Sequence, residues 1–377
     1  MKSRIISNIS EVSKQDWDQC AKSTNPFCSY GFLNALERSG CASADTGWLA
    51  QHIIAENDLG DVVGVMPLYL KNHSQGEYVF DHAWANAFEN ACGHYYPKLQ
   101  CSIPFSPVTG PRLMGENAET KKLLLDTAIN HAEQSGVSSL HFTFIEQDEI
   151  DVMTSHGLLQ RQDQQYHWLN DGYRSFNEFL EALSSRKRKN ILKERRGALE
   201  NDIEIELIQA HEICEHHWDH YFEFYINTAN RKWGRPYLNR EFFSILSENI
   251  PENLLLIMAK RNGHYIAGAL NLIGKDTLYG RYWGATEHHK FLHFELCYYQ
   301  AIEFAIKNGL GKVEAGAQGD HKIARGYVPV ATNSAHWIEN PSFKDAIERY
   351  LNQERRAVSQ DIEYLKEFIP FKKNPLK

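Results

Sequence analysis

One segment of the chain combines acid–base groups, cations and glycines within a short stretch. It reads VEAGAQGDHKIARGY, residues 313–327, and contains Glu314, Gly316, Gln318, Gly319, His321, Lys322 and Arg325. Carboxylate and imidazole groups transfer protons, and the two cations attract an anion. Glycines let backbone amides approach such an anion closely. The spacing matches neither a Walker A loop nor a dinucleotide fingerprint. A solvated loop with a charged helical turn is the alternative, and we favour a functional site at a strand end.

A second candidate site lies at the end of an aromatic strand. The sequence TLYGRYWGA, residues 277–285, brings together Arg281, Tyr282, Trp283 and Gly284 ahead of a predicted helix over 291–308. Free amides at a helix start after a glycine bind phosphate oxygens. The apolar side of that helix includes Leu292, Leu296, Tyr299 and Phe304, with His293 and Glu295 off it. The alternative for this strand is aromatic core packing.

A third candidate is the basic block SSRKRKNILKERR, residues 184–196. Its basic residues are Arg186, Lys187, Arg188, Lys189, Lys193, Arg195 and Arg196. Only Glu194 opposes them, whereas a solvated helix normally mixes charges of both signs. Such a block is suited to the phosphates of RNA, a lipid head group or a coenzyme tail. The alternative is a helix face that is merely solvated.

The histidines of HEICEHHWDH, residues 211–220, do not predict a metal site. His216 and His220 lie four residues apart, but no further ligand stands out and the spacing is not that of a zincin. The chain also has no Gly-x-Ser-x-Gly elbow and no cysteine in a recognisable nucleophile context. A covalent acyl-enzyme is therefore not expected.

Composition narrows the class of protein. The chain has 377 residues, a length that argues for two domains. Its net charge of -8 and pI near 6.1 argue against a DNA-coating protein. No apolar run is long enough for a transmembrane helix, and no signal peptide is evident at the N-terminus. The seven scattered cysteines, without a Cys-x-x-Cys pair, indicate a reduced, cytoplasmic protein.

The chain contains an internal repeat. IIAENDLGDVVGVMPLYL, residues 53–70, and IMAKRNGHYIAGALNLIG, residues 257–274, both read as hairpins and match at Ala55/Ala259, Gly64/Gly268 and Leu68/Leu272. Helical patterns precede each hairpin, and a helix and a strand follow it, ending in 139–145 and 312–316. We expect two mixed α/β domains, 1–170 and 171–377, with turn residues clustered near 170–176.

Five motifs resemble those of the FemAB-like predicted N-acyltransferases, relatives of the peptidoglycan-bridge aminoacyltransferases in the GNAT superfamily. They are SPVTGPRL (106–113), LSSRKRKNI (183–191), LYGRYWG (278–284), LHFELCYYQAIEFA (292–305) and EAGAQGDHKIARGY (314–327). The resemblance implies two tandem GNAT-like domains with mixed, mainly antiparallel sheets. It also implies that an acyl donor lies where strands 277–283 and 312–316 splay apart. The superfamily's usual pyrophosphate signature is absent, so acyl-CoA and aminoacyl-tRNA both stay open as co-substrates.

The resemblance points to an N-acyltransferase in which an amine attacks the acyl donor directly. Glu314 or Glu295 is the expected base and Tyr282 or Tyr327 the expected acid, with His321 as an alternative for either role. The expected substrate and donor contacts are Arg281, Trp283, Gly284, His293, Tyr298, Gly316, Gln318, Gly319, Lys322, Arg325, Arg112, Arg186, Lys187, Arg188 and Lys189. The acceptor is a small-molecule or peptide amine, tRNA is a possible partner, and no permanent cofactor is expected.

Only the second domain is expected to be catalytic, because the strand 139–145 of the first is followed by the acidic stretch EQDEI, which repels a phosphate-bearing donor. The rival interpretation is a non-catalytic binding module for an anionic glycan, a lipid head group or RNA. Such a module needs the basic block and the aromatic residues but no base.

Overall fold

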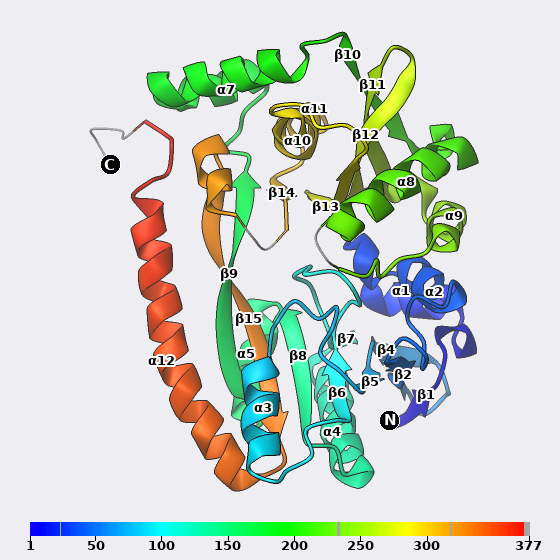
Figure 1. Cartoon of the computed structure of the whole chain (residues 1–377). Coiled ribbons are helices and arrows are strands. Elements are labelled where there is room, and N and C mark those ends of the chain that lie inside the picture. The colour runs from blue at the N-terminus through cyan, green and yellow to red at the C-terminus, as the bar shows by residue number, and fades with distance from the viewer. Residues whose placement is uncertain (23, 232–233, 317–318, 373–377) are drawn as a thin grey trace. The chain divides into compact units, whose positions relative to one another are not determined.

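The structure, a computed structural model, describes residues 1–22, 24–231, 234–316 and 319–372 (Figure 1). The chain forms two compact units. Unit 1 comprises Met1–Asp163 and Ala331–Gln360, and unit 2 comprises Gln164–Val330 and Asp361–Lys377. Along the chain these units interleave, whereas the domains expected from the sequence are continuous. Among the described residues, no helix has both the length and the apolar character that crossing a bilayer requires.

Unit 1 begins with a strand and two short helices and continues with a hairpin. Its elements are β1 (Lys2–Ile6), α1 (Lys14–Ala21), α2 (Tyr30–Arg38), β2 (Trp48–Ala50), β3 (His52–Glu56), β4 (Val62–Met66), β5 (Tyr69–Lys71), α3 (His82–Asn90), β6 (Lys98–Cys101), β7 (Met114–Gly115), α4 (Ala118–Ser135), β8 (Ser139–Ile145) and α5 (Gln147–Ser155). Ser13 and Asn117 accept amide hydrogen bonds at the starts of α1 and α4. Such caps satisfy amides that a helix cannot pair internally.

The sheets of unit 1 are mainly antiparallel. One has the strand order β1-β3-β4-β7. In the other, β15 (Val328–Ile338) is followed by β8, β6, β5 and β2. Strands β6 and β8 pair in parallel, with Leu99 opposite Leu140. Helix α4 covers this region, and Leu124 and Leu140 are fully buried in one core. Burying such side chains contributes roughly 1.5–3 kcal/mol each.

Unit 2 carries the sequence-predicted site segments. Its elements are α6 (Phe176–Ala182), α7 (Ser185–Ala198), β10 (Ile203–Gln209), α8 (Glu215–Arg231), α9 (Arg240–Asn249), β11 (Leu254–Arg261), β12 (His264–Ile273), β13 (Thr277–Ala285), α10 (Leu292–Phe294), α11 (Gln300–Lys307) and β14 (Lys312–Glu314). A π-helical turn, Glu295–Tyr299, joins α10 to α11, and a 3-10 helix spans Asp320–Arg325. The predicted helix over 291–308 and the strand at 277–285 are confirmed.

Two strands diverge in unit 2 beside the site segments. The strand order is β10-β11-β12-β13-β14-β9, where β9 spans Leu159–Leu169. Strand β13 pairs in parallel with β14 only as far as Tyr279, which lies opposite Glu314, and then continues to Ala285. The register between β12 and β13 shifts at Ala269, and Tyr282 has a φ of 24°. A bulge of this kind bends a strand away from its partner and is common next to active sites.

Three elements pass from one unit to the other along the chain. They are β9 (Leu159–Leu169), β15 (Val328–Ile338) and α12 (Pro341–Lys366). The last residues of β9 pair antiparallel with β14 in unit 2, with His167 opposite Glu314. Strand β15 pairs antiparallel with β8 in unit 1 from Asn333 onward. In each unit, the antiparallel strand next to the parallel pair therefore comes from the end of the other half of the chain.

The internal repeat is present at the level of topology. Each copy places a strand (β1 or β10) antiparallel to the first arm of a hairpin, and each has its two preceding helices between them. Both hairpins also have a register shift directly after the matched alanine, Ala55 or Ala259. Together these features confirm the mixed α/β, tandem GNAT-like fold class that the sequence predicted.

The glycines matched by sequence are not equivalent in register. Gly64 pairs with Ala55, whereas Gly268 pairs with Met258, one residue before the matched Ala259. A one-residue shift turns a side chain to the other face of a sheet. Accordingly, a Cβ on Gly64 would meet Thr120 of α4, and a Cβ on Gly268 would meet Tyr221 of α8.

Candidate active site

Glu314 lies at the end of β14 within a cluster of cations. Its carboxylate is 2.8 Å from Lys312 Nζ and 3.3 Å from an Arg281 guanidinium nitrogen. His167 Nε2 of the neighbouring strand β9 lies 3.8 Å away. Glu314 is only 1% exposed, so these charges act on it with little screening by water.

The electrostatics of this cluster make Glu314 a counter-ion. Burial raises the pKa of the Glu314 carboxyl, but the charges of Lys312 and Arg281, and that of His167 when it is protonated, outweigh burial, so that the pKa is lowered overall. A general base works best with a pKa near the working pH. A carboxylate already neutralised by two cations is a weak proton acceptor, which argues against Glu314 as the base.

Lys322, in the 3-10 helix, has the pKa that a general base needs. Its side chain is almost fully buried, and its Nζ donates to the Gly316 carbonyl at 2.8 Å. Burial, together with the charge of Arg281, lowers the pKa of Lys322 to about 7. A sizeable fraction of this amine is therefore neutral at physiological pH, whereas the sequence predicted only a cation that holds an anion.

His321 points its imidazole at a tyrosine of the π-helical turn. Its Nε2 lies 3.0 Å from the Tyr298 hydroxyl, and the imidazole itself is exposed. Gly319 has a φ of 113°, and a Cβ there would come within 2.4 Å of the His321 ring. Any side chain at residue 319 would therefore displace the imidazole, which gives Gly319 a positioning role beyond its backbone conformation.

Arg325 anchors the 3-10 helix to α7. One guanidinium nitrogen donates to both Glu194 carboxylate oxygens at 2.9 Å, and another donates to the His321 carbonyl at 2.7 Å. The guanidinium also lies 3.5 Å from the centroid of the Phe294 ring, a cation–π contact. The Tyr299 hydroxyl donates to the same Glu194 carboxylate. Arg325 thus holds the backbone beside His321 in place.

Glu295 occupies a structural position. It is completely buried, and its carboxylate accepts hydrogen bonds from Arg195 at 2.9–3.2 Å and from Gln300 at 2.7 Å. Sequence periodicity placed Glu295 off the apolar side of the helix. The π-helical turn changes the spacing there, and burial is possible because Arg195 of α7 supplies the opposite charge.

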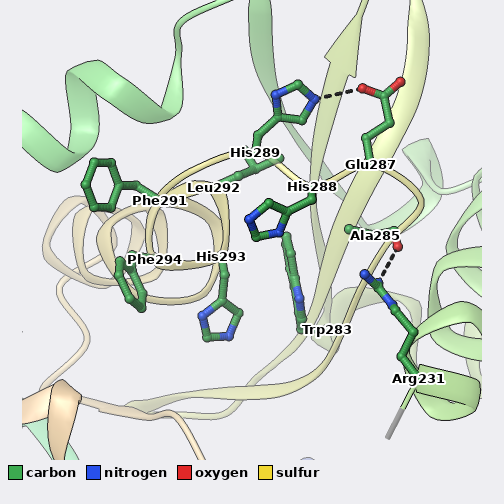
Figure 2. Close-up of a pocket in the computed structure, with 10 residues that line it drawn as sticks. All are labelled: Arg231, Trp283, Ala285, Glu287, His288, His289, Phe291, Leu292, His293 and Phe294. Carbon is green, nitrogen blue, oxygen red and sulfur yellow. Dashed lines mark hydrogen bonds and ion pairs between the residues drawn. The ribbon is translucent and has the colours of Figure 1, made fainter.

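A small pocket lies beside the end of β13 and the start of α10 (Figure 2). It has a volume of about 250 Å³, and Trp283, His288, His293 and Arg231 are among its lining residues. The His293 ring centroid lies 5.2 Å from that of Trp283 and 6.5 Å from that of His321. The pocket therefore joins the predicted contacts Trp283 and His293 to the His321 side of the site.

Gly284 and Tyr282 serve packing in this structure. A Cβ on Gly284 would lie 2.1 Å from the Phe224 carbonyl oxygen, so glycine is required for α8 to approach β13. Helix α10 starts only at Leu292, so Gly284 is not adjacent to the helix start as predicted. The Tyr282 carbonyl accepts a hydrogen bond from Tyr221 at 2.8 Å, and the Tyr282 ring packs edge-on against Tyr225.

Two further predicted residues are fully buried. Burial raises the pKa of the Tyr327 hydroxyl well above its usual value, which makes it a poor proton donor. Arg112, in unit 1, donates to the carbonyls of Val108, Gly110 and Thr143 at 2.8–3.2 Å. With its guanidinium bound to backbone oxygens, Arg112 stabilises its own loop and is not placed as an anion contact.

The basic block forms helix α7, as predicted. Arg186 and Lys189 are exposed, and Lys187 and Arg188 are partly exposed. Within the part of the chain that the structure describes, no ion pair or hydrogen bond engages these four side chains. Arg195 differs, because it pairs with Glu295 and Glu303. Gln318, another predicted contact, lies outside the described residues.

Sequence reasoning missed His167, Lys312 and Glu194 as parts of this site. Burial lowers the pKa of His167 to about 4, so its imidazole is neutral at pH 7. His167 interrupts the apolar end of a strand, and that was a usable signal. The pairings of Lys312 with Glu314 and of Glu194 with Arg325 depend on tertiary contacts that spacing does not reveal.

Comparison with known proteins places this arrangement in a family. Residues 8–373 match the FemAB_like family model, described as peptidoglycan biosynthesis/recognition. The crystal structure of FemX is similar, with a TM-score of 0.59 and 15% identity, covering 92% of this chain and 100% of that one. No curated protein matches the sequence.

A second structural relative is the C-terminal domain (DUF2156) of a putative lysylphosphatidylglycerol synthetase from Agrobacterium fabrum. It has a TM-score of 0.56 and 8% identity, covering 89% of this chain and 96% of that one. At such identities the structural similarities establish the fold alone. The family model covers nearly the whole length of the chain, and the chain has the fold of FemX.

Proposed function

The chain belongs to the FemAB-like family, and from that premise we propose that it transfers an acyl or aminoacyl group to an amine by direct attack. The observation that carries the proposal is Lys322, a buried amine whose pKa of about 7 suits it to accept a proton near neutral pH. It stands next to His321 in a segment whose backbone is held by Arg325. This combination makes unit 2 the catalytic unit.

The reaction needs one proton to leave the attacking amine and one to reach the leaving group. The acceptor nitrogen forms a bond to the donor carbonyl carbon, and Lys322 Nζ takes the proton that this nitrogen loses. The bond from carbon to the ester oxygen or thioester sulfur then breaks. His321, hydrogen-bonded to Tyr298, delivers the proton to the leaving oxygen or sulfur. No covalent enzyme intermediate forms.

Charge in the cluster favours an anionic substrate. Glu314 supplies one negative charge, whereas Lys312 and Arg281 supply two positive charges. Protonation of Lys322 adds a third during the reaction. In a buried site, surplus positive charge stabilises a phosphate or a developing oxyanion more strongly than it would in water. We assign this role to Arg281.

The pocket beside Trp283 suits the end of the acyl donor. Its aromatic wall can stack on a ring, and Arg231 with His288 and His293 offers hydrogen-bond donors to phosphate (Figure 2). Both acyl-CoA and aminoacyl-tRNA contain an adenosine and phosphates, so the pocket is compatible with either. The acceptor that fits the family description is an amine on a cell-wall peptide or amino sugar.

The test is a transfer assay with both donor classes. The purified chain is incubated with aminoacyl-tRNAs or acyl-CoAs and a panel of amine-bearing peptides and amino sugars, and amide products are detected by mass spectrometry. We expect a product with one donor class and its loss in Lys322→Met. Lys275→Met, at an exposed lysine of the same unit, is the control. A stable acyl adduct on the intact protein would contradict direct attack.

A binding module remains the second candidate, because four cations of α7 have no protein partner among the described residues. They suit an anionic glycan, a lipid head group or RNA. If no donor yields a product, and salt-sensitive binding of one of these polyanions survives Lys322→Met, the binding module becomes the better account.

A further inference from the structure

Three metal-ligating side chains meet where α8 begins, outside the candidate active site. Cys214 directly precedes the helix, and His216 and His217 lie in its first turn. One ligand atom from each, a thiol sulfur and two imidazole nitrogens, lie within 4.8 Å of one another. In a tetrahedral zinc site such atoms are about 3.3–3.8 Å apart, as bond lengths near 2.0–2.3 Å require. Small side-chain rotations therefore suffice to bring the three ligand atoms to the spacing of a zinc site.

The surroundings leave these side chains available to an ion. Cys214 and His216 are exposed, which gives an ion and a water molecule access. His217 is buried, and its Nδ1 accepts the Cys214 amide hydrogen at 3.0 Å, so its lone pair already points toward Cys214. A metal ion would take that lone pair in place of the amide hydrogen.

The neighbouring carboxylates are already engaged. Glu215 and Asp219 both pair with Arg240, at 2.6 and 2.8 Å, and Glu206 pairs with Lys260. They therefore do not complete the group as a fourth protein ligand. One sulfur and two imidazole nitrogens with a free fourth position match the ligand set of an open zinc site.

We propose that Cys214, His216 and His217 bind one transition-metal ion of the Zn²⁺ class, with water as the fourth ligand. The sequence did not predict a metal here, because the pairing considered was His216 with His220, without Cys214. Binding releases the thiol proton. The ion would fasten the start of α8, the helix that packs against Gly284 and carries Arg231 to the pocket.

The experiment is a titration of the metal-stripped, reduced full chain with Co²⁺, followed by displacement with Zn²⁺. A cobalt–thiolate bond gives near-ultraviolet charge-transfer absorption that imidazole ligands alone do not give. We expect one equivalent of Co²⁺ to produce this absorption and one equivalent of Zn²⁺ to remove it. Cys214→Ser should abolish the absorption, and His216→Ala should weaken Co²⁺ binding at least tenfold.

Two matched variants serve as controls. Cys92→Ser removes the other exposed cysteine, and His220→Ala removes an exposed histidine of the same helix outside the group. Both should bind Co²⁺ as the wild type does, and circular dichroism should show every variant folded. The proposal is overturned if the wild type shows no thiolate absorption at about 1 mM Co²⁺, or if Cys214→Ser keeps it.

Discussion

Each unit buries charged side chains beside its parallel strand pair, but the two clusters differ in charge balance and access. In unit 1, Lys98 of β6 contacts Glu77 at 2.7 Å and also binds Asp81. Lys71 lies 3.9 Å from Glu77 and stacks on Trp48. Two lysines therefore face two carboxylates, and all four residues are at most 3% exposed.

In unit 2 the charges of the cluster do not balance, and the cluster is partly open to solvent. Glu314 alone faces Lys312 and Arg281, and the Lys312 side chain is 31% exposed. Glycines and the 3-10 helix follow β14, whereas α5 follows β8 in unit 1. There Glu149 accepts the amide hydrogens of Arg112 and Leu113 and fixes a loop. The same topology thus carries a charge-balanced buried network in one unit and a cluster with surplus positive charge in the other.

The largest expected effect comes from breaking the balanced cluster. Lys98→Met should lower the free energy of unfolding by about 3–5 kcal/mol, because it leaves two buried carboxylates without their main partner. Urea denaturation followed by tryptophan fluorescence measures the change. Lys122→Met, at an exposed lysine of α4 paired with Asp126, is the control and should change stability by under about 0.5 kcal/mol. A loss below 1 kcal/mol for Lys98→Met would show that the network does not stabilise unit 1.

Lys322→Met should leave stability unchanged or raise it, and it should remove most of the activity. Turnover should fall by about 10²-fold or more, the usual effect of a lost acid–base group. The folded pKa of Lys322, about 7, lies below its unfolded value, so keeping the lysine costs stability at pH 7. Thermal unfolding of the variant should therefore occur at the same or a higher temperature. A variant that is destabilised as strongly as Lys98→Met would place Lys322 in a structural network instead.

The pH dependence of wild-type activity tests the role of Lys322 as the base without a mutation. Only the neutral amine of Lys322 accepts a proton, so wild-type kcat/KM should rise as pH increases through about 7. The residual activity of Lys322→Met should lack this rise. A wild-type rate that falls over the same interval would contradict a lysine base.

The contrast between the units also shows what sequence can and cannot predict. Helix and strand positions followed from apolar periodicity, and the repeat followed from the Ala55/Ala259 match. The register of the second hairpin arm could not be predicted, because a one-residue shift leaves the local sequence pattern intact. The roles predicted for Glu314, Glu295 and Arg112 took no account of the residues that pair with them. Those partners come from distant segments, and they determine whether a buried charge is free to react.

Charge removal on α7 should have an intermediate effect on affinity. Replacing Arg186, Lys187, Arg188 and Lys189 by Gln should weaken binding of the polyanionic donor about tenfold at low salt and reduce the slope of log K against log salt concentration. Binding titrations at several salt concentrations measure both quantities. Lys121→Gln with Lys122→Gln, on α4 of unit 1, should leave the slope unchanged. An unaltered slope in the α7 variant would make that helix face a solvated surface.

The smallest expected effect is a difference between substitutions at two glycines, Gly316 and Gly319. Both follow β14, and unit 1 has no such glycines directly after β8. Gly316→Ala and Gly319→Ala both introduce a side chain at positive φ, 77° and 113°, which costs about 1 kcal/mol or more in either case. They differ in what the new Cβ meets. Residue 316 has open space around it, whereas at residue 319 the Cβ would approach the His321 ring within 2.4 Å. Gly319→Ala should lose at least as much stability as Gly316→Ala, because its backbone, with φ 113° and ψ 98°, lies outside the left-handed helical region. It should also lose several-fold more kcat, with KM little changed, because only there is the leaving-group proton donor displaced. Steady-state kinetics beside thermal unfolding decide the matter. Equal kcat values in the two variants would mean that the position of His321 does not limit the reaction, and the proton would then have to reach the leaving group by another route.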